Sequence, residues 1–148
     1  MRPETKLKDI YADVLKKHGR VTRVENLCES GTPDFNICIQ GVEAWIEFKA
    51  PPQPVRSSSK VFSRASHKFT PEQVNWIDKQ VKCGGIGLAI IHCGRWMFTV
   101  DGIHIFLLND VTIDQLFDYS LHRVELAPRQ AAEALPDILR RLDLSKRG

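Results

Sequence analysis

Residues 31–49 read GTPDFNICIQGVEAWIEFK, and this stretch decides the fold class. Its centre, Gln40-Gly41, is a short polar gap between two runs that are rich in apolar residues. A two-residue gap that contains glycine is typical of a β-hairpin turn. The sequence therefore predicts two antiparallel strands, over residues 34–39 and 42–50.

The hairpin brings charged side chains together on one face. Counting outward from the turn sets Asp34 directly opposite Glu47, and directly opposed residues share a face with Cβ atoms about 4.5–5.5 Å apart. Lys49 lies two residues beyond Glu47 and therefore shares that face. The reverse face carries apolar side chains that suit a core, namely Phe35, Ile37, Ile39, Ala44, Ile46 and Phe48. The sequence thus predicts one core face and one charged face.

Two opposed carboxylates destabilise a sheet unless a cation balances them. Mg²⁺ and Mn²⁺ prefer oxygen ligands, and Mg²⁺ commonly takes only one or two carboxylates. Such an ion activates a bound water and stabilises charge on a phosphoryl oxygen, while Lys49 could orient that water or neutralise the transition state. The alternative interpretation is a solvated ion cluster on an exposed strand face. The joint geometry, beside a Gly-x-Pro turn and an apolar reverse face, favours the catalytic interpretation.

The flanking sequence predicts the remaining elements of the core. Helical spacing of apolar residues predicts a helix over residues 3–18, and alternation predicts a short strand over residues 20–25. Thr70 and Gln73 form a capping-box pattern that begins the next helix. An apolar run over residues 86–93 predicts a buried strand. The resulting order, α-β-β-β-α-β, indicates a mixed α/β or α+β fold.

The C-terminal extension, residues 95–148, is predicted to contain a hairpin around Asp101-Gly102 and then helices. The expected elements are strands over residues 95–100 and 103–108, a helix over 110–119 and a second helix within 129–144. Pro136 either starts or kinks that second helix. The length suits a single domain of residues 1–148, with a core of about residues 4–92.

The order of motifs resembles that of a nuclease superfamily. Residues 33–34 (PD), twelve intervening residues and residues 47–49 (EFK) resemble the PD-(D/E)xK signature. The closer resemblance is to small phage-type virus-type replication-repair nuclease (VRR-NUC) domains, through residues 31–34 (GTPD) and 69–76 (FTPEQVNW). It covers about residues 4–92 and implies a restriction-endonuclease-like αβββαβ core, with a mixed central sheet flanked by helices.

The resemblance also implies roles for individual residues. Asp34 and Glu47 would bind Mg²⁺ or Mn²⁺ together with the backbone carbonyl of Phe48. Lys49 would be the catalytic lysine, and Gln73 would help to fix the site.

The additional acid of the family has two candidates in this sequence. Glu25 lies in the segment that leads into the Pro-Asp turn, and we favour it for that reason. Glu4 matches the glutamate of the family's first helix in position. Either residue is otherwise an ordinary surface carboxylate.

The charge distribution predicts a DNA-binding loop. The net charge is only +3, because 21 Lys and Arg stand against 18 Asp and Glu. Residues 50–71 contain no acidic residue, and their basic residues are Arg56, Lys60, Arg64, His67 and Lys68. This loop could bind phosphates on both sides of a scissile bond, or it could be a plain flexible loop. Residues 99–119 contain acidic residues but no Lys or Arg, so we expect them to face away from DNA.

These features predict a Mg²⁺- or Mn²⁺-dependent DNA endonuclease that hydrolyses phosphodiester bonds. By resemblance to VRR-NUC domains and Holliday junction resolvases, its substrate is branched or structured DNA, such as a junction or flap, in phage replication, recombination or repair. A homodimer would let two sites cut paired strands. The alternatives are a catalytically silent DNA-binding module of the same fold, and a phage protein that binds and inhibits a host enzyme.

The sequence also bears on localisation. No apolar run reaches the ~18 residues that span a bilayer, so we expect no membrane association. The first eight residues lead into no apolar segment of the kind found in secretory signals. We therefore expect a cytoplasmic protein, in the host cytoplasm if a phage encodes it.

Overall fold

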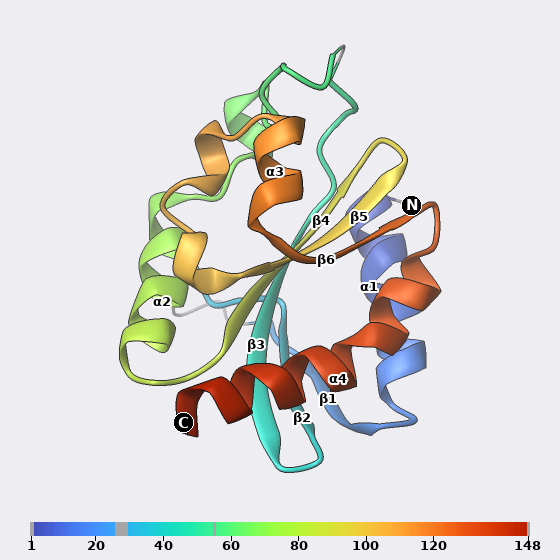
Figure 1. Cartoon of the computed structure of the whole chain (residues 1–148), viewed down its shortest axis with the longest axis vertical. Coiled ribbons are helices and arrows are strands. Elements are labelled where there is room, and N and C mark those ends of the chain that lie inside the picture. The colour runs from blue at the N-terminus through green and yellow to red at the C-terminus, as the bar shows by residue number, and fades with distance from the viewer. Residues whose placement is uncertain (1, 26–29, 55, 148) are drawn as a thin grey trace.

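The computed structural model describes residues 2–25, 30–54 and 56–147 (Figure 1). Its helices are α1 (Pro3–Leu15), α2 (Pro71–Lys82), α3 (Ile113–Tyr119) and α4 (Pro128–Arg147). Its strands are β1 (Gly19–Arg23), β2 (Phe35–Ile39), β3 (Val42–Lys49), β4 (Gly87–Cys93), β5 (Trp96–Asp101) and β6 (Ser120–Glu125). The order α1-β1-β2-β3-α2-β4 confirms the predicted αβββαβ core.

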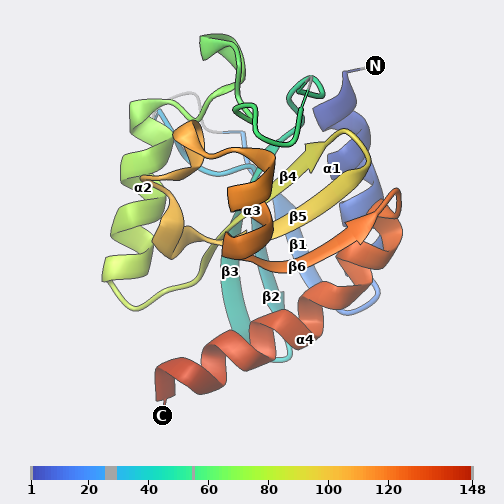
Figure 2. The ribbon, with the colours of Figure 1, turned by 45° about the horizontal axis from the view of Figure 1, so that its top comes forward.

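The six strands form one mixed sheet in the order β1-β2-β3-β4-β5-β6. Only β3 and β4 are parallel, and α2 makes the crossover between them, as a parallel pair requires. Helices α1 and α4 cover one face of the sheet, and α2 and α3 cover the other (Figure 2). Each face buries its own apolar core, so the molecule has three layers.

The β2–β3 hairpin has the predicted turn and register. Gln40 and Gly41 have φ values of 53° and 81°, the left-handed conformation that a type I′ hairpin turn needs at both central positions. Ile39 pairs with Val42, and Phe35 pairs with Ile46. The same register continued by one residue sets Asp34 opposite Glu47, as the sequence predicted.

The predicted core face is also confirmed. All six apolar residues of that face are buried in the core under α1 and α4: Phe35, Ile37, Ile39, Ala44, Ile46 and Phe48. Glu47 and Lys49 pair with Ala89 and Ile91 of β4, which belong to the second core, under α2 and α3. The charged face of the hairpin therefore points into the layer that contains α2.

The predicted hairpin around Asp101-Gly102 is wrong. The Asp101 carboxylate accepts a hydrogen bond from the N–H of Ile103 at 3.1 Å, and a 3₁₀ turn over Gly102–His104 follows. A Cβ on Gly102 would lie 2.6 Å from the backbone oxygen of Gly87, so this glycine allows two backbone segments to approach closely. The turn that does join two strands lies between β4 and β5, at Gly94-Arg95.

Two further features of the C-terminal part differ from the prediction. On the side away from β4, β5 pairs with β6, a strand that the sequence pattern did not indicate. Helix α4 begins at Pro128 and continues through Pro136, so Pro136 does not start it. No helix in the described ranges has an apolar stretch that could cross a membrane.

Candidate active site

The site begins at a turn that packs against the first turn of α2. Gly31 has a φ of +85°, and a Cβ there would lie 2.4 Å from the backbone oxygen of Glu72. Only glycine fits both the left-handed conformation and this approach. The chain then enters β2 directly after Asp34, so the Gly-x-Pro-Asp turn sets that carboxylate at the start of the strand.

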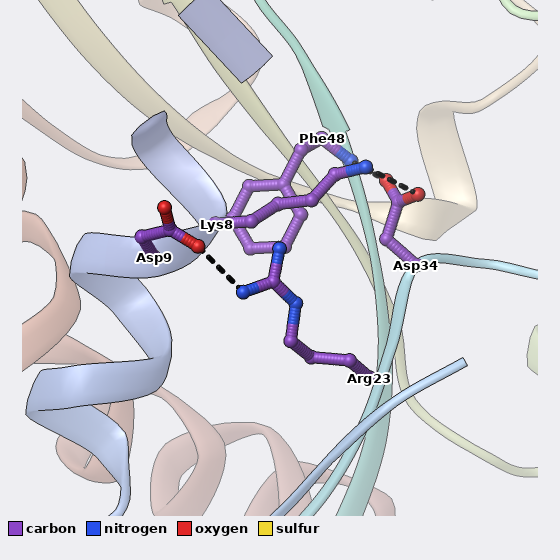
Figure 3. Close-up of polar contacts among 5 residues, drawn as sticks. All are labelled: Lys8, Asp9, Arg23, Asp34 and Phe48. Carbon is purple, nitrogen blue, oxygen red and sulfur yellow. Dashed lines mark hydrogen bonds and ion pairs between the residues drawn. The ribbon is translucent and has the colours of Figure 1, made fainter. Parts of the chain in front are cut away.

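Both oxygens of Asp34 have partners (Figure 3). Oδ2 accepts a hydrogen bond from the backbone N–H of Phe48 at 2.9 Å, across the hairpin. Oδ1 lies 3.0 Å from the Nζ of Lys8, which reaches it from α1. An ion pair between Asp9 and Arg23, at 2.6 Å, joins the same helix to the end of β1. Two strands and a helix therefore position this carboxylate.

Glu47 is a buried carboxyl with incomplete hydrogen bonding. Only 3% of the residue is exposed, and its side chain is hydrogen-bonded to Asp34. Its Oε2 is buried and has no hydrogen-bond partner among the described residues. The pKa of Glu47 is raised to about 10, mainly by burial and also by the hydrogen bond and the charge of Asp34, while the charges of Lys49 and Lys8 act in the opposite direction. A second carboxylate beside a buried one thus keeps a proton on the pair.

Lys49 is the buried cation of the site, and only 8% of the residue is exposed. Its Nζ donates a hydrogen bond to the carbonyl of Lys68 at 3.2 Å and lies 5.2 Å from the centre of the Phe69 ring. The segment before α2 therefore covers the charged face of β3. This burial rules out the solvated surface cluster as an account of Glu47 and Lys49.

Lys8 is a residue of this site that the sequence analysis missed. It is one of two lysines on α1, and its spacing carries no signal that separates it from a solvated surface residue. Its contact with Asp34 depends on how α1 packs over β1 and β3, where Tyr11 contacts Phe48. The Lys8 ammonium supplies positive charge where the sequence analysis expected a metal ion.

The remaining predicted site residues are Gln73, Glu25 and Glu4. The Gln73 Oε1 accepts a hydrogen bond from the Thr70 N–H, and the Thr70 hydroxyl accepts one from the Gln73 N–H, so Gln73 forms the predicted capping box. Glu25 is exposed, two residues beyond β1. Glu4 is half-buried in the first turn of α1 and lines a cavity at the end of β3. Neither glutamate has a described contact with Asp34 or Glu47.

The donor set fits a hard divalent cation. The described residues contain no group of three or more His, Cys, Asp and Glu side chains arranged to hold a metal ion. Mg²⁺, however, commonly takes only one or two carboxylates and completes its shell with other oxygens. The unpartnered, buried Oε2 of Glu47 beside Asp34 is the feature of this structure that such an ion would satisfy.

The predicted DNA-binding segment, residues 50–71, is called the basic loop below. It is anchored to the second core, under α2 and α3. Val61, Phe62 and Phe69 are buried in that core. The Phe69 N–H donates to the Asn109 side-chain oxygen at 2.8 Å, and the Asn109 amide donates to the Phe69 carbonyl at 2.9 Å. These contacts argue against a plain flexible loop for this segment.

The five basic side chains of the loop differ in their surroundings. Arg56 and Arg64 are exposed, and His67 and Lys68 are half-buried. The Nζ of Lys60 donates a hydrogen bond to the carbonyl of Asp110. Asn109 and Asp110 therefore contact this loop, so part of the stretch over residues 99–119 adjoins the predicted DNA-binding segment. That the stretch faces away from DNA stays a prediction.

No family model matches the chain, and no curated protein sequence matches it. Among solved structures, the chain is similar to Hjc, a Holliday junction resolvase from the archaeal hyperthermophile Archaeoglobus fulgidus. The match covers 91% of this chain and 98% of that chain, with 12% sequence identity and a TM-score of 0.48. At this identity the likeness concerns the fold alone.

Proposed function

We propose that this protein is a metal-dependent endodeoxyribonuclease of the PD-(D/E)xK superfamily, with residues 1–148 as a single nuclease domain similar to small phage-type VRR-NUC domains. One observation carries the proposal: a buried Glu47 with an unpartnered oxygen lies beside Asp34, on the same face as the buried Lys49. Burying two ionisable groups, Glu47 and Lys49, is unfavourable for folding unless they are paired or serve a function. Such clusters are typical of catalytic sites.

In this proposal Asp34 and Glu47 hold Mg²⁺ or Mn²⁺ together with the Phe48 carbonyl. The bound ion would lower the pKa of a water molecule and stabilise charge on the phosphoryl oxygens. Glu47 must lose its proton to become a ligand, and Lys8 must yield the Asp34 oxygen that it contacts. We infer that Glu25 supplies the additional acid, because the neighbouring Val24 N–H donates to the Asp34 carbonyl at 2.8 Å.

Lys49 would act on the reacting phosphate. Its ammonium is held by the Lys68 carbonyl and the Phe69 ring, so its position is fixed before substrate binds. From there it orients the attacking water or neutralises the negative charge of the pentavalent transition state. Gln73 would be a positioning residue, because its capping box fixes the start of α2 against the Gly31 turn.

We infer that the substrate is branched or structured DNA in phage replication, recombination or repair. The basic loop lies beside Lys49 and carries side chains that can bind phosphates, namely Arg56, Lys60, Arg64, His67 and Lys68. A homodimer would allow paired cuts on two strands, and a cytoplasmic location suits a DNA substrate.

The test is a cleavage assay on supercoiled plasmid and on a four-way junction, each with Mg²⁺, Mn²⁺ or EDTA. We expect metal-dependent cleavage by the wild-type protein and by Lys16→Ala, which removes an exposed lysine. Asp34→Ala and Lys49→Ala should be inactive while keeping a cooperative thermal transition. Cleavage in EDTA, or full activity of both site variants, would refute the assignment. Binding of the junction without cleavage in any metal would identify a silent DNA-binding module, and neither binding nor cleavage would favour the inhibitor alternative.

A further inference from the structure

A second feature of the molecule is a cavity of about 540 Å³ at the edge of the sheet where β3 and β4 end. We call it the edge cavity. Its walls come from the start of α1, the segment after β3, the 3₁₀ turn before α2 and the turn after β4, and its side chains include Glu4, Pro51, Pro52, Gln53, His67 and His92. The start of α1, the loop after β3 and the tip of β4 lie together in Figure 2. Crevices beyond the carboxyl ends of parallel strands commonly bind ligands.

The edge cavity adjoins the candidate active site. Ala50 lines the cavity and directly follows Lys49 on the chain. His67 also lines it and directly precedes Lys68, whose carbonyl accepts the hydrogen bond from the Lys49 ammonium. Two residues of the cavity wall are therefore chain neighbours of Lys49 and of the residue whose carbonyl holds its ammonium.

The lining suits a flat heterocycle better than a phosphate. Pro51 and Pro52 present apolar surface, and His67 and His92 present planar rings on which a base can stack. The volume lies within the ~300–1,000 Å³ range of small-molecule sites. Arg2 and Glu4 line the cavity with opposite charges, so it offers no excess positive charge for an isolated phosphate. These properties favour a nucleobase as the occupant.

The polar atoms of the cavity can form hydrogen bonds with the edge of a base. The Nε2 of His92 donates to the Gly94 carbonyl at 3.1 Å, which leaves Nδ1 as the acceptor of the neutral ring. The Nδ1 of His67 is buried and has no partner among the described residues. The Gln53 amide both donates and accepts, whereas the Glu4 carboxylate only accepts. A carboxylate in this position favours a base that carries an exocyclic amino group.

A neighbouring cavity supplies contacts for the flanking backbone. It has a volume of about 470 Å³, and its lining includes Lys60, Ser63, Lys68 and Asp110, so two ammonium groups stand against one carboxylate. The two cavities share Gln53. A single DNA strand that crosses Gln53 would place a base in the edge cavity and the adjacent phosphate beside two lysines.

We propose that the edge cavity binds one unpaired nucleobase of the DNA, adjacent to the phosphodiester bond that is cut. This rests on the proposed nuclease function and deepens it, since it assigns the substrate class to DNA with an unpaired nucleotide at the cleavage position. A paired base inside a duplex cannot enter a cavity until it leaves the stack. Adenine, cytosine and guanine are favoured over thymine, which has no exocyclic amino group.

The first test measures binding without catalysis. Fluorescence anisotropy in EDTA compares a labelled duplex with the same duplex carrying one unpaired nucleotide. We expect the wild-type protein to bind the unpaired form at least about tenfold more tightly, with unpaired thymine at least about threefold weaker than cytosine. Ser66→Trp places an indole at the cavity wall and should remove the preference. Ser58→Trp changes an exposed serine of the same loop outside the cavity and should keep it.

The second test needs no variant. The unpaired nucleotide is replaced by 2-aminopurine, a fluorescent base with an exocyclic amino group. Stacking in the cavity should change its emission at least about twofold at saturating protein, while 2-aminopurine in the paired duplex should keep its emission. An unchanged emission from the unpaired base, equal affinity for both DNAs, or a preserved preference in Ser66→Trp would overturn the cavity assignment.

These readouts separate the two proposals. Binding preference without cleavage in Mg²⁺ or Mn²⁺ would support the nucleobase site and overturn the nuclease. Cleavage of both DNAs at equal rates with equal affinities would support the nuclease and overturn the nucleobase site.

Discussion

Phe48 and Glu47 are consecutive residues of β3 and both are buried, yet they lie on opposite faces of the sheet. The Phe48 ring packs edge-on against Tyr11 and Phe35, with ring centres 5.1 and 4.9 Å apart. The Glu47 carboxyl is buried beside Asp34 with one oxygen unpartnered. The first face is arranged for stability, whereas the second keeps an unfavourable arrangement that a bound cation would relieve. Under the proposed function, catalysis and stability would divide between the two faces of one strand.

The largest expected effect comes from Asp34→Asn, which removes a charge from the proposed active site without changing the shape of the side chain. Because an amide is a poor ligand for Mg²⁺, we expect the cleavage rate to fall at least about a thousandfold, or about 4 kcal/mol in the barrier. Initial rates on a four-way junction measure this. Asp118→Asn, an exposed position on α3, is the matched control and should cleave normally. An Asp34→Asn rate within tenfold of wild type would exclude Asp34 as a metal ligand.

The opposite face is tested by Phe48→Leu. The smaller side chain loses the two edge-on ring contacts and leaves space in the core, so we expect the free energy of unfolding to fall by about 1–3 kcal/mol. Chemical denaturation measures this change, and Phe106→Leu, at an exposed phenylalanine, should be neutral. Cleavage per folded molecule should stay within about threefold of wild type. A larger loss of activity with normal stability would show that the two faces are not separate.

Glu47→Gln tests how much the buried carboxyl group lowers the stability of the metal-free protein. Between pH 4.5 and about 10 the folded state keeps a proton that the unfolded state loses, so the stability of the metal-free protein falls as pH rises through this window. Glutamine can donate to Asp34 as the protonated acid does, and it cannot ionise. We expect Glu47→Gln in EDTA at pH 8 to raise stability by at least about 1 kcal/mol, or about 2–4 °C in Tm.

Thermal unfolding from pH 6 to pH 9 measures this effect. The wild-type Tm should fall across the range more steeply than that of Glu47→Gln. The control is Glu43→Gln, an exposed position of the same strand, which should follow the wild type. Parallel profiles for wild type and Glu47→Gln would contradict a raised pKa at Glu47.

The smallest effect is expected from Lys8→Met. The Lys8 ammonium pairs with the Asp34 oxygen that a cation would need, and both side chains are about one-fifth exposed, which weakens the pair. Removing it should tighten Mn²⁺ binding about two- to fivefold, equivalent to about 0.5–1 kcal/mol. Calorimetric titration with Mn²⁺ measures this affinity, and Lys6→Met on the same helix is the control. Weaker Mn²⁺ binding would instead make Lys8 a supporting residue of the metal site.

The sequence allowed prediction wherever the signal was local. The Gln40-Gly41 turn sets the register of the hairpin, and the register sets Asp34 opposite Glu47. The capping box of Thr70 and Gln73 likewise uses residues three apart, and the structure contains it. In both cases, neighbouring residues alone determine the geometry.

Prediction of the secondary structure failed where a short sequence pattern is compatible with more than one local structure. Asp101-Gly102 resembles a hairpin turn, but Asp101 begins a 3₁₀ turn and Gly102 serves a close contact with Gly87. Strand β6, over Ser120–Glu125, is a half-exposed edge strand without strong turn signals at its ends. Its assignment depends on pairing with β5, which no short window of sequence contains.

By itself, the sequence determined the alternation of β3 and therefore which residues share the face of Glu47. Only the tertiary structure decided that this face is buried, because its cover is supplied by Lys68 and Phe69, about twenty residues further along the chain. The same is true of Lys8, which reaches Asp34 only because α1 packs over β1 and β3. Register follows from local backbone geometry, whereas burial and the pKa of Glu47 depend on segments that meet only after folding.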